Sequence, residues 1–297
     1  MPVKGLYTGA MGMMVQMKNQ EVIANNLANV QTPGYKKEIT TFKPFQKIYE
    51  RRINDDGVFV TPHGTIDKRP YVGKVGTGVI VDETYTDNTA GPLRKTDNPF
   101  DVAIHGEGYF CVSPKSQGAP SPGVKGLELG EGNTAVSTES GKKEVYTRCG
   151  TFTLDAENFL VTLQGDYVLG EDSRPIQIDK RDFSLLEDGR ILTNSTDQAT
   201  GWASPIESGK IKIVDFDYRP GLQKVGTNYL VPSSASGQPK VREEGFQIMQ
   251  GHLEGSNVNI VDEMVRMIDV MRIYEANAKS ISTADQTMGM IIPIGGQ

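Results

Sequence analysis

Apolar side chains recur with helical spacing near both ends of the chain, in residues 3–28 and 260–289. The apolar positions step alternately by three and by four residues, which keeps them on one face of a helix that winds around a partner helix. We therefore expect two terminal helices that pack against each other. The N-terminal ladder consists of Val3, Leu6, Ala10, Met13, Met17, Gln20, Ala24 and Leu27, and the C-terminal ladder of Ile260, Met264, Met267, Met271, Tyr274, Ala278, Ile281, Asp285 and Met288.

One polar residue interrupts each ladder, Gln20 in the first and Asp285 in the second. A polar residue in such a seam can fix the register of the paired helices, and we expect that role for both. Most of the 11 methionines also lie in these two segments. They are either core filler or an adaptable packing surface, because methionine fills irregular spaces in several environments. Either use places them on the buried seam.

A turn ends the first predicted helix. Thr32-Pro33-Gly34-Tyr35 has Pro and Gly as the middle residues of a type II turn. Gly5, Gly9 and Gly12 lower the helix propensity before this turn, so packing must hold the helix together.

The second predicted helix starts after Gly255-Ser256-Asn257. Asn257 or Asn259 can cap it, because a side-chain oxygen at the cap accepts a hydrogen bond from a free backbone N–H. Asp262 and Glu263 in the first turn complement the positive end of the helix dipole.

Between the helices the chain has the short strand-like runs and Gly-rich turns of a β structure. Residues 98–112 hold a turn, a strand, a second turn and a second strand, and Asp155-Ala156-Glu157-Asn158 supplies a hairpin turn. Residues 114–143 are rich in Gly, Ser and Pro, which predicts a mobile surface loop. Further strands are predicted at Tyr146–Arg148, Thr151–Leu154, Phe159–Leu163, Tyr167–Leu169, Phe183–Leu186, Ile191–Thr193, Lys210–Phe216 and Asn228–Val231.

The predicted fold class is therefore α+β, with N- and C-terminal helices pairing as a coiled coil and a central mainly-β domain. We expect the N-terminal helix within residues 1–34 and an extended linker with short strands within 35–80. The central β-rich domain is expected within residues 81–245, and the C-terminal helix and tail within 246–297.

Charge and hydropathy argue against several classes of protein. The net charge is −6, and the basic residues are scattered apart from Lys36-Lys37 and Arg51-Arg52, whereas nucleic-acid binding needs a clustered basic surface. No run approaches the ~18 apolar residues of a membrane span. Polar residues at 19–21 interrupt any signal-peptide core and no cleavage site follows, so we expect no cleaved signal peptide.

The sequence predicts neither an active site nor a cofactor or metal site. His63, His105 and His252 are far apart and form no zinc-binding spacing, and the chain has no GxSxG motif. Two cysteines cannot form a disulfide framework for a protein of this size. Cys111 and Cys149 lie in strand-like runs, which favours buried free thiols over a cross-strand disulfide. We therefore expect a protein that is not an enzyme.

Three sets of motifs resemble the bacterial flagellar axial proteins, which comprise the rod, hook and hook-associated proteins. Asn25-Asn26-Leu27-Ala28-Asn29 followed by Thr32-Pro33-Gly34-Tyr35-Lys36 resembles their N-terminal signature. Leu253–Asn259, Glu263–Val265 and Arg272–Asn277 resemble their C-terminal signature. The central signature of the rod and hook branch is similar to Asn98–Ile104, Gly106–Phe110, Tyr146–Arg148 and Gly150–Phe152. The resemblance covers the whole chain in the right order.

The resemblance implies a structural subunit of the flagellar basal-body rod, which crosses the periplasm and transmits motor torque to the hook. In this family the terminal helices pack as a coiled coil that lines the inner tube, outside which the β-rich domain lies. The implied partners are other copies of the chain, other rod proteins, and the flagellar type III export apparatus, which exports such subunits unfolded and uncleaved. The expected assembly interface comprises Leu6, Met13, Met17, Asn25, Asn26, Leu27, Asn29, Ile260, Met264, Met267, Met271, Tyr274, Ile281 and Met288.

Alternatives remain open inside and outside the family. A hook protein is usually longer, the loop at 114–143 is longer than we expect for the distal rod protein, and Pro33 and Tyr35 depart from a Thr-Gly-Phe often seen there. These differences favour the proximal rod protein over the distal rod protein and the hook protein. Outside the family, the alternative is a secreted β-rich enzyme or adhesin, which would need a concave pocket with convergent polar groups.

Overall fold

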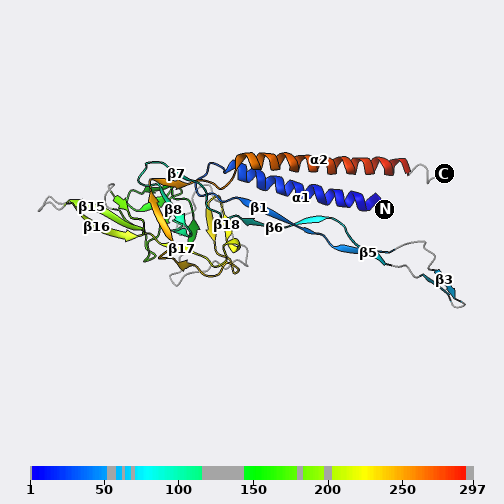
Figure 1. Cartoon of the computed structure of the whole chain (residues 1–297), viewed down its shortest axis with the longest axis horizontal. Helices are drawn as coiled ribbons and strands as arrows, with labels where there is room; N and C mark the ends of the chain where they lie inside the picture. The colour runs from blue at the N-terminus through cyan, green and yellow to red at the C-terminus, as the bar shows by residue number, and fades with distance from the viewer. Residues whose placement is uncertain are drawn as a thin grey trace. The chain divides into compact units, whose positions relative to one another are not determined.

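The computed structural model describes residues 2–51, 58–61, 64–67, 71–115, 144–178, 183–196 and 203–291. These residues divide into two compact units, each assembled from separated segments of the chain (Figure 1). Unit 1 takes its residues from Met1–Asn25, Ile39–Thr84 and Val261–Gln297, and unit 2 from Asn26–Glu38 and Tyr85–Ile260. The predicted loop at 114–143 lies outside the described residues from 116 onward, and so does the tail at 292–297.

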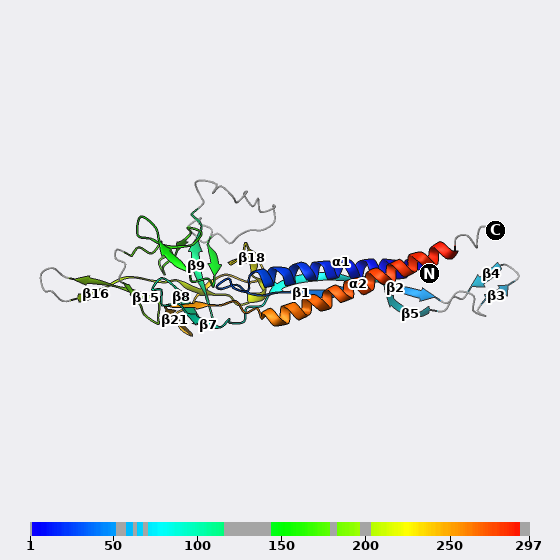
Figure 2. The same ribbon diagram turned by 90° about the horizontal axis from the view of Figure 1, so that it is seen from above.

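Unit 1 contains most of helices α1 (Pro2–Ala28) and α2 (Ile260–Ile291), which lie side by side in Figures 1 and 2. Glycines form the closest contact between them. A Cβ atom on Gly9 would lie 3.0 Å from Cγ1 of Ile281, and one on Gly12 would lie 2.9 Å from Nδ2 of Asn277. The glycines that weaken α1 by propensity therefore let α2 approach closely. The predicted coiled-coil pairing of the terminal helices is confirmed, and the two helices run antiparallel.

The face that each helix turns to the other differs from the predicted ladder by one residue at several positions. Gly9 and Gly12 of α1 meet α2, where the ladder has Ala10 and Met13. One residue corresponds to a rotation of about 100° around a helix. The error has a physical reason: glycine contributes nothing to an apolar pattern, yet it marks the place where two helices come closest.

Helix α2 keeps half of its predicted ladder inside unit 1. Met267, Ile281 and Met288 are half-buried as expected, whereas Met264 and Met271 are exposed. The buried positions one residue before these two are Glu263 and Val270. Of the nine ladder positions of α2, four are half-buried and five are exposed; the half-buried ones are Met267, Ala278, Ile281 and Met288.

The predicted linker forms antiparallel strands. Strand β1 (Glu38–Pro44) pairs with β6 (Val79–Thr86), β2 (Lys47–Arg51) with β5 (Tyr71–Gly76), and β3 (Val58–Thr61) with β4 (Gly64–Asp67). Within unit 1 the start of β6 lies against α1. Thr8 Oγ1 donates a hydrogen bond to the carbonyl oxygen of Thr77 (3.1 Å), and a Cβ on Gly78 would lie 3.2 Å from Cβ of Met11.

Unit 2 is built on a nine-stranded sheet. Its main path has the order β11-β12-β13-β9-β10-β19-β18, with β17 beside β9 and β20 beside β17. Smaller pairings join β14-β15-β16, β8-β21 and β7-β22. The bounds are β7 (Leu93–Lys95), β8 (Val102–Gly106), β9 (Tyr109–Ser113), β10 (Val145–Thr147), β11 (Phe152–Leu154), β12 (Leu160–Thr162), β13 (Tyr167–Val168), β14 (Phe183–Leu185), β15 (Arg190–Thr196), β16 (Ala203–Lys210), β17 (Ile213–Asp215), η1 (Arg219–Gly221), β18 (Gln223–Val225), β19 (Tyr229–Val231), β20 (Lys240–Val241), β21 (Phe246–Gln250) and β22 (His252–Glu254).

Strand β9 is buried on both faces, which explains its uninterrupted apolar sequence. Phe110 belongs to one core cluster, in which its ring meets that of Phe152 edge to face at 5.2 Å. Tyr109 and Cys111 belong to a second cluster, which also contains Tyr146 and Phe216. Successive side chains of a strand point to opposite faces, so β9 joins the two cores of unit 2.

Several local predictions are confirmed. Gly34 has φ of +69° and the N–H of Tyr35 bonds to the carbonyl of Thr32, as the predicted turn requires. The hairpin turn at 155–158 closes through a bond from the N–H of Asn158 to the carbonyl of Asp155. The sequence missed β7, β16, β18 and β20–β22, of which β21 and β22 lie in the segment assigned to the C-terminal helix and tail.

Candidate assembly surface and motif junction

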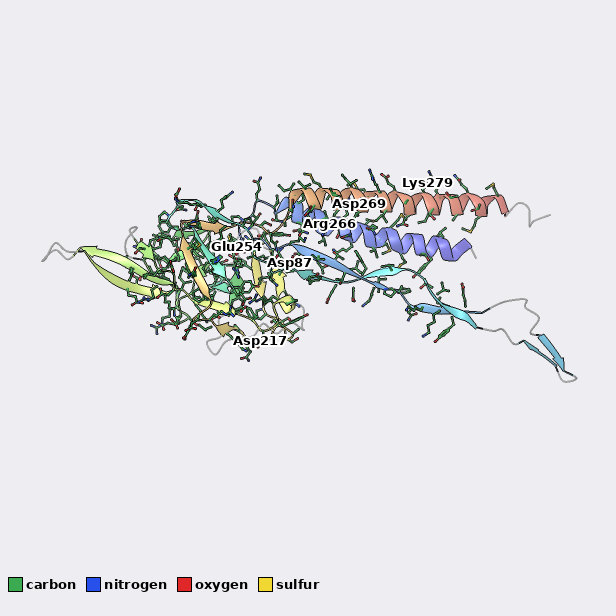
Figure 3. All side chains as sticks on the ribbon, viewed as in Figure 1. Asp87, Asp217, Glu254, Arg266, Asp269 and Lys279 are labelled. Atoms are coloured by element: carbon green, nitrogen blue, oxygen red, sulfur yellow. The ribbon has the colours of Figure 1, made fainter. Side chains whose placement is uncertain are left out.

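The N-terminal, central and C-terminal motifs of the sequence meet inside unit 2 around one carboxylate, that of Glu254 (labelled in Figure 3). Nζ of Lys36 lies 2.6 Å from Oε1 of Glu254, and Nη1 of Arg148 lies 3.2 Å from Oε2. The Glu254 side chain is 1% exposed. We call these three side chains the motif junction, because each comes from a different signature motif.

Backbone groups complete the hydrogen bonding of the junction. The N–H of Gly91 donates to Oε1 of Glu254 (2.9 Å), and Nζ of Lys36 donates to the carbonyl of Thr89 (2.6 Å). Two buried cations therefore share one buried carboxylate. Burial lowers the pKa of Lys36, although the neighbouring Glu254 opposes this change. Breaking such a buried ion pair is costly, because it leaves an uncompensated charge in a low dielectric.

Close backbone contacts explain two of the motif glycines. A Cβ atom on Gly34 would lie 2.4 Å from the backbone nitrogen of Cys149, and one on Gly150 would lie 1.6 Å from the carbonyl oxygen of Val102. A side chain at either position would force the N-terminal segment or β8 away from the central strands. The motifs thus encode close packing as well as charge.

Two asparagines fasten the segments next to the helices within unit 2. Oδ1 of Asn26 accepts hydrogen bonds from Tyr35 Oη (3.1 Å) and the N–H of Glu38 (2.9 Å). Oδ1 of Asn257 accepts one from the N–H of Lys37 (2.8 Å), while its Nδ2 donates to the carbonyl of Asp87 (2.9 Å). The side chain of Asn257 therefore connects two segments of unit 2. The residue directly before α2 is Asn259.

Helix α2 carries an apolar face that no described residue of unit 1 covers. The side chains of this face are between 42% and 66% exposed. They lie on the side of α2 opposite Asn277 and Ile281, which face α1. We call this set the outer row; it consists of Val261, Met264, Val265, Ile268 and Met271.

A second apolar surface lies between α1 and β6. It is a groove of about 410 Å³, lined mostly by apolar side chains with Lys18 and Glu21 among them. Nζ of Lys18 and Oε2 of Glu21 are 2.8 Å apart, and both side chains are exposed. We call it the methionine groove; its other lining residues are Met11, Met14, Val15, Met17 and Val79–Val81.

The predicted interface residues fall into three classes of exposure. Asn26 is buried, and it is joined to the segment before β1 rather than to solvent. The half-buried ones are Leu6, Met13, Leu27, Asn29, Met267, Ile281 and Met288. The exposed ones are Met17, Asn25, Ile260, Met264, Met271 and Tyr274.

Sequence reasoning missed part of both sites. Val261, Val265 and Ile268 of the outer row have helical spacing that was readable beside the ladder. The charges of Lys36 and Glu254 lie inside recognised motifs, but no local pattern reveals that residues 218 positions apart form an ion pair.

The two cysteines are free. Cys111 is buried, and its thiol lies 3.3 Å from Oε2 of Glu144. Burial raises the pKa of this thiol, so it stays protonated at neutral pH. Cys149 is half-buried. The prediction of free thiols is therefore confirmed, and Cys111 and Cys149 do not form the alternative cross-strand disulfide.

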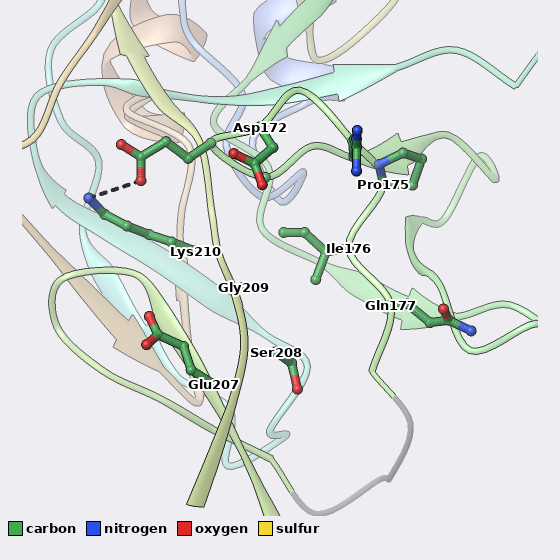
Figure 4. A pocket seen from close by; sticks show the side chains of 11 residues that line it. Asp172, Pro175, Ile176, Gln177, Glu207, Ser208, Gly209 and Lys210 are labelled. Atoms are coloured by element: carbon green, nitrogen blue, oxygen red, sulfur yellow. Dashed lines mark ion pairs between the residues drawn. The ribbon is translucent and has the colours of Figure 1, made fainter.

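Unit 2 has a cleft of the kind that an enzyme would need for its active site (Figure 4). It measures about 540 Å³ and lies between residues 170–177 and residues 207–210. Figure 4 marks the ion pair of Lys210 and Glu171, whose charged atoms are 3.4 Å apart. The described lining residues include neither histidine nor cysteine, and the one serine among them, Ser208, is hydrogen-bonded to Thr193. The cleft holds no paired nucleophile and base.

Neither a metal-binding cluster nor a membrane-crossing helix occurs in the described part of the chain. Among those residues, no group of three His, Cys, Asp or Glu side chains is placed to hold a metal ion. Neither α1 nor α2, as far as they are described, combines the length and apolar character of a membrane-crossing helix.

Comparisons with known proteins match both ends of the chain and its middle. The flagella basal body rod protein family matches residues 6–36, and the C-terminal family of the flagellar basal body rod FlgEFG proteins matches residues 249–292. The D1 domain family of the flagellar hook protein FlgE/F/G matches residues 129–200.

Relatives extend the similarity over the whole length. The flagellar basal-body rod protein FlgG of Borreliella burgdorferi is 34% identical over 292 residues, which cover 97% of each chain. FlgG of Buchnera aphidicola subsp. Acyrthosiphon pisum is 32% identical over 292 residues, covering 96% of this chain and 97% of its own. FlgG of Bacillus subtilis is 30% identical over 298 residues, covering 98% of each.

Proposed function

Because the chain belongs to the family of flagellar basal-body rod proteins and is a structural subunit of that rod, we propose that it builds the rod by packing its terminal helices against those of neighbouring subunits. The observation that carries this proposal is the outer row of α2. An apolar face this regular, on a helix whose opposite side already packs on α1, favours a protein partner.

The energetics support an assembly role. Burying one apolar side chain contributes ~1.5–3 kcal/mol, and the outer row offers five. Two of these side chains, Met264 and Met271, are methionine, which adapts to different packing partners. The surface is therefore suited to repeated contacts among copies of this chain and other rod proteins.

The proposal includes the mechanical role of the rod. Helices that pack along a common axis form a shaft, and a shaft that crosses the periplasm transmits torque from motor to hook. The subunit acts as a structural element rather than a catalyst, and the flagellar type III export apparatus is its proposed route to the rod. Its place along the rod, proximal or distal, stays a prediction, which density or labelling in isolated basal bodies would decide.

Met271→Asp tests the assembly surface. Met271 is 42% exposed, so the variant should keep the far-UV circular dichroism and thermal midpoint of the wild-type monomer. A charge on the outer row should abolish incorporation into the rod and motility. Ser280→Asp is the matched control, because it adds the same charge at an exposed polar position of α2 that is turned about 120° away from Ile268 of the row. Motile cells carrying Met271→Asp would contradict the proposal.

A further inference from the structure

Unit 1 has two exposed apolar surfaces, the outer row and the methionine groove, that do not pack against each other within one chain. The outer row lies on the side of α2 away from α1. Among the described residues, the methionine groove is lined by α1 and β6 alone, and α2 instead meets α1 at Gly9 and Gly12. A row and a groove on different sides of one unit suit a head-to-tail contact, which can repeat from copy to copy.

We propose that the outer row of one subunit docks into the methionine groove of a second copy. This inference rests on the proposed function and names the surface that receives α2. The groove volume of about 410 Å³ lies within the ~300–1,000 Å³ of sites that enclose drug-sized groups, so it has room for several side chains. Met14 and Met17 at its rim are exposed, and their flexible side chains can close over an inserted row.

The charges beside the two surfaces are complementary. Lys18 and Glu21, three residues apart, line the groove. Asp269 and Arg272, also three residues apart, come directly after Ile268 and Met271 of the outer row. Figure 3 labels Asp269 on α2, next to Arg266. In the docked pair Lys18 meets Asp269 and Glu21 meets Arg272, which replaces the exposed ion pair of Lys18 and Glu21 by two contacts between subunits.

The same charges select an orientation. If α1 of one copy ran antiparallel to α2 of the next, Lys18 would face Arg272 and Glu21 would face Asp269, and like charges would repel. The complementary arrangement needs the two helices to run parallel. This contact therefore differs from the antiparallel pairing of α1 and α2 inside one chain, where Gly9 and Gly12 face Ile281 and Asn277.

Cysteine cross-linking in isolated basal bodies tests the contact. The variant carries Met14→Cys in the groove and Ile268→Cys in the row, with Cys149→Ser to remove the half-buried native thiol. Mild oxidation should link neighbouring copies into a ladder at least tenfold more abundant than in the control with Met14→Cys and Gln286→Cys. Equal yields from the two variants would overturn the proposal.

Charge reversal gives a second, independent readout in the full chain. Lys18→Glu with Glu21→Lys should reduce rod incorporation at least tenfold, and so should Asp269→Lys with Arg272→Glu. All four substitutions together should restore incorporation to within about twofold of wild type. If the fourfold variant is as defective as either pair, the groove is not the receiving surface. The proposed function would still stand if Met271→Asp blocks assembly, and would fail separately if it does not.

Discussion

The side chains of the motif junction show what single residues contribute to this fold. Glu254 balances the charge of two cations, Lys36 and Arg148. Substitutions at the three positions should therefore change the free energy of unfolding by different amounts. The sequence identified all three motifs but gave no reason for their residue types. The reason is spatial: segments far apart in the chain meet at one carboxylate and at two glycines without room for a Cβ atom.

Glu254→Gln should destabilise unit 2 more than Lys36→Met. Removing the carboxylate leaves two buried cations, at a cost of ~3–5 kcal/mol. Removing the lysine leaves one cation with one carboxylate and should cost about 1–2 kcal/mol in lost hydrogen bonds. Urea unfolding followed by tyrosine fluorescence would measure both free energies. The reverse order would show that Arg148 alone does not balance Glu254.

Gly34→Ala should be more harmful than Gly226→Ala. Both glycines have φ of +69°, so both variants pay the ~1–2 kcal/mol of a left-handed residue with a side chain. Only Gly34 also faces backbone, 2.4 Å from Cys149 N, whereas nothing lies within 4 Å of the Cβ position of Gly226. The clash should add about 1–3 kcal/mol. Equal losses in urea unfolding would mean that the N-terminal segment can move away freely.

Acid should weaken unit 2 through a surface ion cluster. Hydrogen bonds from Arg219 and Arg242 hold the pKa of Glu107 at about 2, and Arg219 also keeps the pKa of Asp215 low although burial would raise it. Carboxyl groups with a lowered folded pKa stabilise the fold above their unfolded pKa, which is about 4.5 for Glu107 and about 3.8 for Asp215. That contribution is lost as the pH falls toward 2.

Glu107→Gln isolates this share of the acid response. The variant should lose less stability than wild type between pH 4.5 and pH 2, because its side chain does not titrate. The difference should be small and should shrink in high salt, since Glu107 is half-exposed. Parallel curves of unfolding free energy against pH would exclude Glu107 from the response.

At the level of elements, apolar periodicity found both helices and most strands of the central sheet. It did not orient the helices correctly, because the contact between them depends on glycine, which carries no hydrophobic signal. It also missed β21 and β22, whose short sequences gain their stability from pairing with β8 and β7. The outer row and the methionine groove could not be predicted from the sequence alone, because each depends on which face of a helix stays uncovered in the fold.

Gly9→Val should disturb the helix pair, and Gly5→Val should not. A Cβ at Gly9 already lies 3.0 Å from Ile281, so a branched side chain must push α2 outward. Nothing lies within 4 Å of the Cβ position of Gly5, and valine is a slightly better helix former than glycine. Far-UV circular dichroism during heating should show an earlier loss of helix for Gly9→Val alone. Matching melting curves would place the helix contact elsewhere.

For the whole molecule, the division into two units predicts the outcome of limited proteolysis. The resistant core should span residues 85–260 rather than end near 245, because β21 and β22 belong to unit 2. A peptide containing residues 26–38 should stay bound to that core, because Lys36 pairs with Glu254 and the N–H of Lys37 donates to Asn257. Mass spectrometry of the protected material would identify both fragments. Terminal helices as resistant as the core would argue against an assembly role for the free subunit.

The ion pair of Lys36 and Glu254 spans 218 positions of the chain, which bears on the timing of folding. A ribosome releases Lys36 long before Glu254, so unit 2 cannot complete its junction until Glu254 has been synthesised. Contacts of such long sequence separation also form slowly, because the loop must close first. The chain is therefore open to chaperones while the intervening residues are made, and its slowest folding step is expected to be the joining of the segments that carry Lys36 and Glu254.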